Sequence, residues 1–458
     1  GPHPTFSVAY GTGADTVSIL KDNGTVINKA GTINASGPIT GITSLGHVFN
    51  SFSTNDRVDI SQLPISALAA DDYSIADFMQ SSNAFPSTFG VDSAFDTHGS
   101  MAVGGIAAGL SFIHWGESGE YSNAKTVTAM VNRTYNTGHL VGAIRGAWLA
   151  NSATADRGPK ANTLTNNGSA VTAAAVETSA ELLGYSGFTA DNNLSRASDA
   201  DWDVIGTGAV VITCWFKDST QSGTKTLMGF GNSGDTTTFV AYLAAGTIAV
   251  NIDGATTQVV PNPAGQWADG VWHQVVIAHH SSVYREIFMD GVLLVTDSTD
   301  VGSISDSGNM PLVIGVWPDG SSNPASTTTI ALARLSVTIP TATQIRQMYD
   351  AEKGMFVASA KCLLQSGSTD AVLDVSVDPI TSKVAVTQTD SQMIWNGLVM
   401  ESAPAVNAGA SEHNKLFGGD RVEINSVNLY ATVAAKSLRG DLELVRGMKA
   451  GLPAGVDL

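Results

Sequence analysis

Pairs of short apolar strands recur along this sequence, and the repeat constrains the fold more than any other feature. One pair lies in residues 383–397, where an apolar strand, a polar link and a second apolar strand follow one another. Further pairs begin at Ser7, His47, Met101 and Tyr430. The second strand of each pair starts about nine to twelve residues after the first, and neighbouring pairs lie about 40 to 55 residues apart, as propeller blades do.

The repeat is interrupted by a block of about 200 residues, long enough for a domain of its own. Three pairs precede this block and two follow it. The order predicts one domain inserted into another: about five propeller blades over 4–150 and 359–447, followed by a tail at 448–458. If the pair at 383–397 is a blade, its apolar residues should be buried in the ring, and these are Val384, Val386, Met393 and Ile394.

Composition agrees with an all-β protein of more than one domain. The chain has 458 residues, 43% of them hydrophobic and only 14% charged, with 47 Gly. Such a length favours two or three cores, and many turn residues with few charges are typical of short strands joined by turns. The net charge of −18 disfavours nucleic acid and anionic membrane surfaces as partners. No apolar run is long enough to span a membrane.

The two cysteines, Cys214 and Cys362, are too few for a disulfide framework. We expect buried free thiols, with a single disulfide as the alternative. The chain opens on Gly1-Pro2 without a Met, which is expected of a protease scar or of a cut end.

The inserted block has the pattern of an antiparallel β-sandwich over 184–358. Short strands follow one another at close spacing, and Asp290-Gly291 is the turn of a clear two-residue hairpin. Residues 151–183, rich in Ala, Asn, Thr and Ser, predict a linker, in which 171–183 has the pattern of an amphipathic helix.

One helix follows the sandwich strands. Thr341 is the expected N-cap and Gln344 completes a capping box. Ile345, Met348 and Tyr349 then form an apolar stripe that can dock on the sandwich, and the helix should end before Gly354.

Several segments of the insert resemble a laminin G-like, concanavalin A-like jelly roll. The segments are 272–276, 288–295 and 331–353, and the form with a trailing helix is familiar from bacteriophage tail fibres. Residues 135–146, which begin Tyr135-Asn-Thr-Gly138, are also similar to those fibres. The resemblance implies an extracellular receptor-binding protein of the virion, a homotrimer that binds a bacterial surface glycan through the sandwich. No heptad pattern supports the trimer.

Calcium is the metal that the resemblance implies, held at the sandwich rim by Asp235 or Asp319. The acidic run at 199–203 is a second candidate, but it has Val204 and Val210 where a calcium loop needs Gly and Glu. A solvated turn is the favoured interpretation of that run.

Catalytic residues are not predicted. Glycosidases of this fold use the pattern E-x-D-x-x-E, which the sequence lacks. His279 and His280 with Glu286 could suggest a base or a metal ligand, but neighbours on a strand point to opposite faces, which favours a surface pair.

Sugar binding is predicted for aromatic side chains in polar surroundings. Trp317 lies in a loop with Asp319 and Asn323, where packing in the turn and contact with a ligand are equally compatible with the pattern. Trp215 points away from the core side of its strand, either as a stacking platform or under another element. Two rival functions remain open: a glycan depolymerase or glycosidase, and a bacterial surface adhesin.

Overall fold

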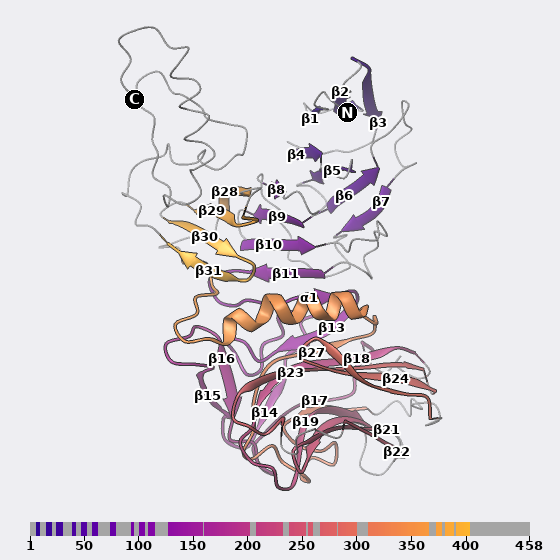
Figure 1. The fold of residues 1–458 in the computed structure, drawn as a ribbon, viewed down its shortest axis with the longest axis vertical. Coiled ribbons are helices and arrows are strands. Elements are labelled where there is room, and N and C mark those ends of the chain that lie inside the picture. Colours follow the sequence, from indigo (N-terminus) through magenta and orange to yellow (C-terminus); the bar gives the residue numbers. More distant parts are fainter. Residues whose placement is uncertain are drawn as a thin grey trace.

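The computed structural model describes the strands between residues 6 and 114 and most of residues 127–403. Within the second range it leaves out residues 159, 202–207, 232–237, 253–254, 260–265, 282, 300–309, 366–371, 378–380 and 389–390. Figure 1 shows a sandwich of two sheets at one end of the molecule and smaller stacked sheets at the other, with helix α1 (Ala342–Glu352) between them. No helix in the described ranges has the length and hydrophobicity that a membrane crossing requires.

Two antiparallel sheets form the sandwich. In the eight-stranded sheet the order is β15-β16-β27-β18-β23-β24-β25, with β13 also paired to β27. In the seven-stranded sheet it is β14-β17-β26-β19-β20-β21-β22. The first sheet consists of β13 (Ile144–Trp148), β15 (Thr172–Ala175), β16 (Leu183–Ser186), β18 (Val210–Lys217), β23 (Trp272–Ser281), β24 (Tyr284–Met289), β25 (Val292–Asp297) and β27 (Thr329–Ser336). The second consists of β14 (Thr165–Asn167), β17 (Asn193–Arg196), β19 (Thr224–Gly231), β20 (Thr238–Ala244), β21 (Thr247–Ile252), β22 (Ala255–Val259) and β26 (Leu312–Ile314).

The main core lies between these two sheets. Alternate residues of β18 enter it from Val210 to Phe216, and Cys214 among them is a buried free thiol. The opposite sheet supplies Phe230 and Phe239, whose rings stack 5.2 Å apart. Cys362 is also buried and free, so the free-thiol prediction is confirmed for both cysteines.

The predicted linker at 151–183 is wrong, because this stretch contributes strands to both sheets. Strand β14 pairs with β17, and β15 pairs with β16 in the register Thr172↔Ser186. The helix predicted over 171–183 is absent for the same reason. Pairing of β16 with β27, through Tyr185 and Ile330, outweighs the helical preference of an Ala-rich segment.

Helix α1 begins as the sequence predicts. Thr341 is its N-cap, and the capping box with Gln344 is formed in both directions. Ile345 packs on the outer face of the eight-stranded sheet, against Val276 and Phe288 among others. Met348 packs instead against Val127, in the sheet above. The helix is therefore a layer between the sandwich and the smaller sheets.

Four of the predicted strand pairs are present as antiparallel pairs in these smaller sheets: β1 with β2, β5 with β6, β9 with β10, and β29 with β30. The fifth, which begins at Tyr430, lies outside the described residues, as does the predicted tail. The sheets consist of β1 (Phe6–Ala9), β2 (Asp15–Leu20) and β3 (Val26–Ala30); β4 (Ile39–Ile42), β5 (His47–Phe52), β6 (Arg57–Gln62) and β7 (Ser74–Phe78); β8 (Ser93–Phe95), β9 (Ser100–Gly105), β10 (Gly109–His114), β11 (Val127–Val131) and β12 (Leu140–Val141); and β28 (Val372–Val377), β29 (Val384–Gln388), β30 (Gln392–Asn396) and β31 (Val399–Ser402).

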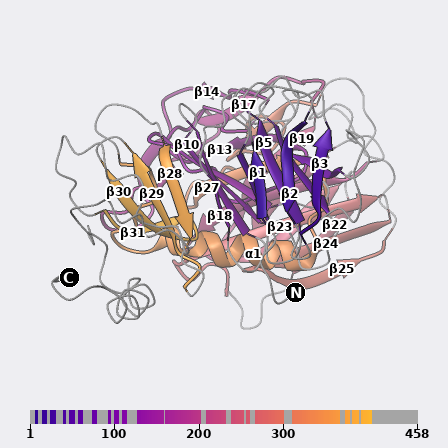
Figure 2. The ribbon, with the colours of Figure 1, turned by 90° about the horizontal axis from the view of Figure 1, so that it is seen from above.

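The segments before and after the sandwich meet again in space. Strand β28 lies beside β8 and β9. Seen from above, the sheet of β28–β31 lies to one side and the sheet of β1–β3 to the other, both over the sandwich (Figure 2). None of the sheets that the structure describes closes on itself, so the propeller stays a prediction.

Burial in the pair β29–β30 follows the alternation of the strands. Val386 and Met393 face each other and are buried, as predicted. Ile394 is only half-buried, because neighbours on a strand point to opposite faces and Met393 takes the inner one. Val384, also half-buried, lies opposite the fully buried Trp395.

Candidate functional site

The outward side of the seven-stranded sheet combines a small buried apolar cluster, formed by Val240, Tyr242 and Ala249, with polar side chains around it. In β20, Phe239, Ala241 and Leu243 point into the core, so Val240, Tyr242 and Ala244 point outward. The same alternation in β21 turns Ala249 and Asn251 outward. This face, as a local structure, follows directly from the two-residue period of the strands.

Charges are nearly absent from these strands. The seven described strands carry two charged residues, Arg196 and Lys225. Arg196 forms an ion pair with Asp199 at 2.6 Å, and Lys225 forms one with Asp218 at 2.5 Å. The strand positions between them present amides, hydroxyls and apolar groups.

An aromatic pair joins this face to the loop that follows β26. The rings of Tyr242 and Trp317 meet edge to face, with centroids 5.4 Å apart. Trp317 is half-buried and belongs to the loop between β26 and β27. Two backbone bonds shape that loop: the N–H of Trp317 donates to Ser322 O at 2.9 Å, and Gly320 N–H donates to Trp317 O at 2.8 Å.

The other two predicted residues of this loop hold it in shape. Asp319 Oδ1 accepts the backbone N–H groups of Ser321 and Ser322 at 2.8 and 2.7 Å. Partial burial alone would raise the pKa of Asp319, but its bonds with Ser322 and Ser321 outweigh that effect and lower it. Asn323 has a φ of 49° and its carbonyl accepts from Thr226 N–H. The structure thus brings Trp317, Asp319 and Asn323 together.

Rows of amides and hydroxyls continue across the face. Thr238 Oγ1 donates to Asn251 Oδ1, and Asn251 Nδ2 donates to Thr256 Oγ1 at 3.1 Å. Near the opposite edge, Asn167 Nδ2 donates to Asn193 Oδ1 and Ser195 Oγ at 2.7 and 2.8 Å. We call this surface the outer face and define it by Asn167, Asn193, Ser195, Thr238, Tyr242, Asn251, Thr256 and Trp317.

The predicted calcium ligands are not gathered with other carboxylates in the part of the chain that the structure describes. Asp319 Oδ1 is engaged in its own loop, and Asp235 lies outside the residues that the structure describes. In the described ranges no three His, Cys, Asp or Glu side chains gather as metal ligands would. In the acidic run, Asp199 binds Arg196, and Asp201 binds Lys160 at 3.0 Å, as a turn held by ion pairs does.

Trp215 is not a ligand platform, so this predicted site residue is wrong. It is 2% exposed, on the outer side of the eight-stranded sheet, under α1 and the 3-10 helix η2 (Lys353–Phe356). Its ring stacks on Tyr349 at 5.6 Å and on Phe356 at 4.2 Å. Of the two interpretations of this residue, coverage by another element is the one observed.

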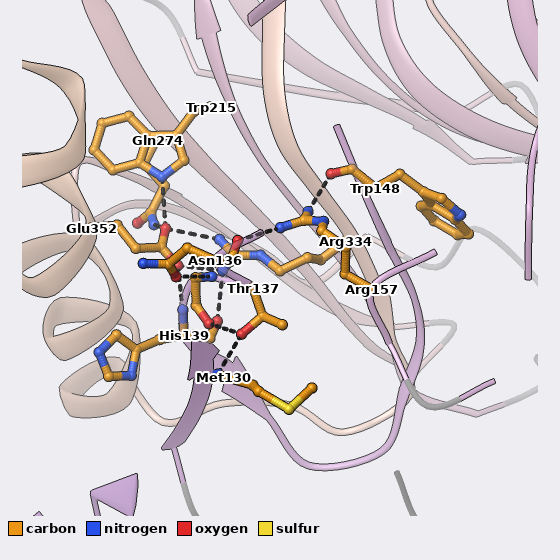
Figure 3. A network of polar contacts seen from close by, with 11 residues as sticks. Met130, Asn136, Thr137, His139, Trp148, Arg157, Trp215, Gln274, Arg334 and Glu352 are labelled. Carbon is orange, nitrogen blue, oxygen red and sulfur yellow. Dashed lines mark hydrogen bonds and ion pairs between the residues drawn. The ribbon is translucent and has the colours of Figure 1, made fainter. Parts of the chain in front are cut away.

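Trp215 belongs to a buried polar network centred on Glu352 (Figure 3). The carboxylate accepts from Trp215 Nε1 at 2.7 Å, Gln274 Nε2 at 3.0 Å and the backbone N–H of His139 at 2.7 Å. It also forms a bidentate ion pair with Arg334. Burial alone would raise the pKa of Glu352, but Arg334 and these hydrogen bonds outweigh it and lower the pKa. The network is structural.

The segment that begins at Tyr135 forms the upper side of this network. Asn136 Nδ2 donates to the carbonyls of Cys362 and Leu398 at 3.1 and 3.3 Å. Gly138 has a φ of +66°, and a Cβ there would lie 2.7 Å from Glu352 Oε1. The motif therefore joins three distant segments of the chain. The motif is recognisable in the sequence, but no local pattern indicates Glu352 as its partner.

His279 and His280 lie on opposite faces, as predicted, but only one is at the surface. His280 Nε2 contacts Glu286 at 2.9 Å. His279 is 1% exposed, opposite Arg285 on the neighbouring strand, with its ring against the edge of Phe239. The predicted surface pair is thus wrong for His279.

The burial of His279 predicts a loss of stability in acid. Burial, aided by Arg285 and His280, lowers the pKa of His279 from 6.5 to about 4. Native His279 stays neutral where the unfolded chain takes up a proton, so stability should fall as the pH drops from about 6.5 toward 4, by on the order of 3 kcal/mol. Urea unfolding across this window measures it. His279→Leu should flatten the dependence relative to His280→Gln, and equal slopes would contradict the assignment.

The comparisons with known proteins concern the sandwich. A family model described as "Concanavalin A-like lectin/glucanases superfamily" matches residues 189–345. The sandwich has the concanavalin A-like lectin fold. The jelly-roll resemblance seen in the sequence is therefore confirmed for this part of the chain. No curated protein matches the chain.

Solved structures similar to the chain share little of its sequence. Domain 4 of AbnA, a GH43 extracellular arabinanase from Geobacillus stearothermophilus, in complex with arabinotriose, is 13% identical with a TM-score of 0.33, over 45% of this chain and 98% of that one. The receptor-binding domain of botulinum neurotoxin D is 10% identical with a TM-score of 0.35, over 55% of this chain and 63% of that one. The serotype D domain in complex with N-acetylneuraminic acid is 9% identical with a TM-score of 0.36, over 58% of this chain and 62% of that one. The chain thus spans less than two thirds of either toxin domain.

Proposed function

We propose that the lectin-fold sandwich binds a carbohydrate on its outer face. The observation that carries the proposal is the Tyr242–Trp317 pair beside the row of Thr238, Asn251 and Thr256. A sugar ring presents apolar C–H groups on its faces and hydroxyls at its edge. Aromatic rings with nearby amides and hydroxyls match both, and small-molecule sites combine these groups in this way.

The biological setting that we propose is host attachment by a bacteriophage tail fibre. Support comes from the sequence resemblance of 135–146 and of the sandwich with its trailing helix, and from the paired strands on both sides of the insert. In this proposal the strand pairs are propeller blades that carry the sandwich toward a bacterial surface glycan. Several copies on a virion, as in a homotrimer, would raise avidity by about 10² to 10⁴ over single-site affinity.

We propose binding without catalysis. A glycosidase needs two carboxyl groups flanking the scissile bond. The seven strands of the outer face, as far as the structure describes them, carry no Asp or Glu. This favours binding over a depolymerase. The third candidate, a bacterial adhesin, would use the same face and differ only in where the protein is displayed.

A glycan array with the whole chain tests the proposal. Trp317→Ala should weaken binding about tenfold or more, since burying an aromatic side chain contributes about 1.5–3 kcal/mol. Tyr242 is only 8% exposed and packs against Trp317, so Tyr242→Ala should weaken binding less, through lost support of the Trp317 ring. Tyr284→Ala, on β24 of the other sheet, is the matched control and should bind as the wild type does. Binding to no bacterial saccharide would remove the basis of the proposal. Release of new reducing ends from a bound glycan would instead identify a depolymerase.

A further inference from the structure

The sandwich has an unusual balance of charges. Residues 144–353 contain 10 Lys and Arg against 19 Asp and Glu. The excess of carboxylates creates a negative potential around the domain, which repels anions and steers them away. The positions of the ten cations decide whether any anionic ligand could still be held.

Every one of these cations is engaged within the protein. Nine form ion pairs with carboxylates, and the tenth, Arg157, is buried and donates to the carbonyl of Asn136 at 2.8 Å. The nine pairs are Arg145 and Lys160 with Asp201, Arg196 with Asp199, Lys217 with Glu177, Lys225 with Asp218, Arg285 with Asp297, Arg334 with Glu352, and Arg346 and Lys353 with Asp350.

This set of cations is complete for the sandwich. The stretches within 144–353 that the structure leaves out contain no Lys, Arg or His in their sequence. Both cations on the strands of the outer face are held in ion pairs. Lys225 is 5% exposed and held by Asp218, and Arg196 is 29% exposed and held by Asp199.

We infer that the outer face takes uncharged saccharides and rejects acidic ones. The inference rests on the proposed function and names the class of its ligand. Carboxylate, sulfate and phosphate groups on sugars are recognised through charge-assisted hydrogen bonds, most often from Arg. Here every Lys and Arg of the sandwich already has a carboxylate partner or is buried, so such a bond competes with an existing contact. The hydroxyls of a neutral sugar need only the amides and hydroxyls of Asn251, Thr256 and their neighbours.

Arg196 is the more exposed of the two cations on this face, and its ion pair with Asp199 is the easier one to break. Surface ion pairs contribute little to stability, about 0–1 kcal/mol. Binding of acidic glycans to the wild type that Arg196→Gln abolishes would show that an acidic sugar replaces Asp199, and would overturn the inference.

The test uses matched glycans on one array. Neutral amylose, mannan, arabinan and galactan are printed beside polygalacturonate, alginate and polysialate, and each acidic polymer is also printed after reduction of its carboxyl groups. We expect all bound glycans to be uncharged, to bind at least about tenfold more strongly than any acidic form, and to change little between about 50 and 500 mM salt. An acidic glycan that loses binding on carboxyl reduction overturns the inference and leaves the proposed function standing. Binding to nothing overturns both.

A gain of function makes the test sharper. Thr256 is exposed on β22, so Thr256→Arg adds a cation to the same face without removing a core contact. The variant should bring the acidic forms of bound polymers within about tenfold of their neutral forms. A folded Thr256→Arg protein that still rejects every acidic form would show that charge is not what excludes them.

Discussion

Replacing Glu352 by Gln should lower the free energy of unfolding by about 3–5 kcal/mol, the usual cost of breaking a buried ion pair. The amide would leave Arg334 as an uncompensated charge in the interior. The NH₂ group of the new side-chain amide would also face other hydrogen-bond donors, because Trp215 Nε1, Gln274 Nε2 and the His139 N–H all point at the native carboxylate. Urea unfolding at neutral pH measures the change.

Asp350 provides the control on the same helix. It pairs with Arg346 and Lys353 at the surface, at 2.6 Å from each. Asp350→Asn should cost no more than about 1 kcal/mol, since exposed pairs contribute little. If Glu352→Gln costs no more than Asp350→Asn, the network does not hold the sandwich, the helix and the sheet above it together.

Gly315→Ala should destabilise the sandwich by about 2–5 kcal/mol, combining a backbone and a packing cost. Gly315 has a φ of +85°, which an alanine adopts at a cost. Its Cβ would also overlap the ring of Phe188, which is fully buried in the main core. Thermal or urea unfolding reports the loss. Because Gly315 begins the Trp317 loop, glycan binding should weaken as well.

A substitution at Gly320, in the same loop, measures the backbone cost without the packing cost. Its φ is +77°, but an added Cβ would meet nothing within 4 Å. Gly320→Ala should therefore cost only the backbone part, about 1–2 kcal/mol. Combining Gly315→Ala with Phe188→Ala should cost less than the sum of the two, since the smaller side chain makes room. Equal effects at Gly315 and Gly320 would exclude the clash with Phe188.

Local patterns in the sequence predicted much of the sandwich. Asp290 and Gly291 both have positive φ, 50° and 75°, as the two-residue hairpin turn requires. The capping box at Thr341 needed only residues within one turn. Strand β13 was missed as part of the sandwich because its partner is β27, with Ile144 opposite Ser336. No local pattern reports a pairing across that distance along the chain.

The candidate site was predicted in part for the same reason. Trp317, Asp319 and Asn323 are neighbours in sequence, so one loop was enough to find them. Tyr242 and Asn251 were missed, although alternation in β20 and β21 points both outward. Trp215 was placed on the correct side of its strand, but only the folded chain shows that α1 covers it.

The hydrogen bonds of Asn136 connect the segments that flank the inserted sandwich. The chain leaves the smaller sheets after β12 and returns near Cys362, and Asn136 binds the carbonyls of Cys362 and Leu398 from the departing side. The sheets on either side of the insert are therefore joined by these two hydrogen bonds and by the contact of β28 with β8 and β9. The two segments that flank the insert are thus bonded to each other directly, and the outer face belongs to the sheet of the sandwich on the far side from this contact (Figure 1).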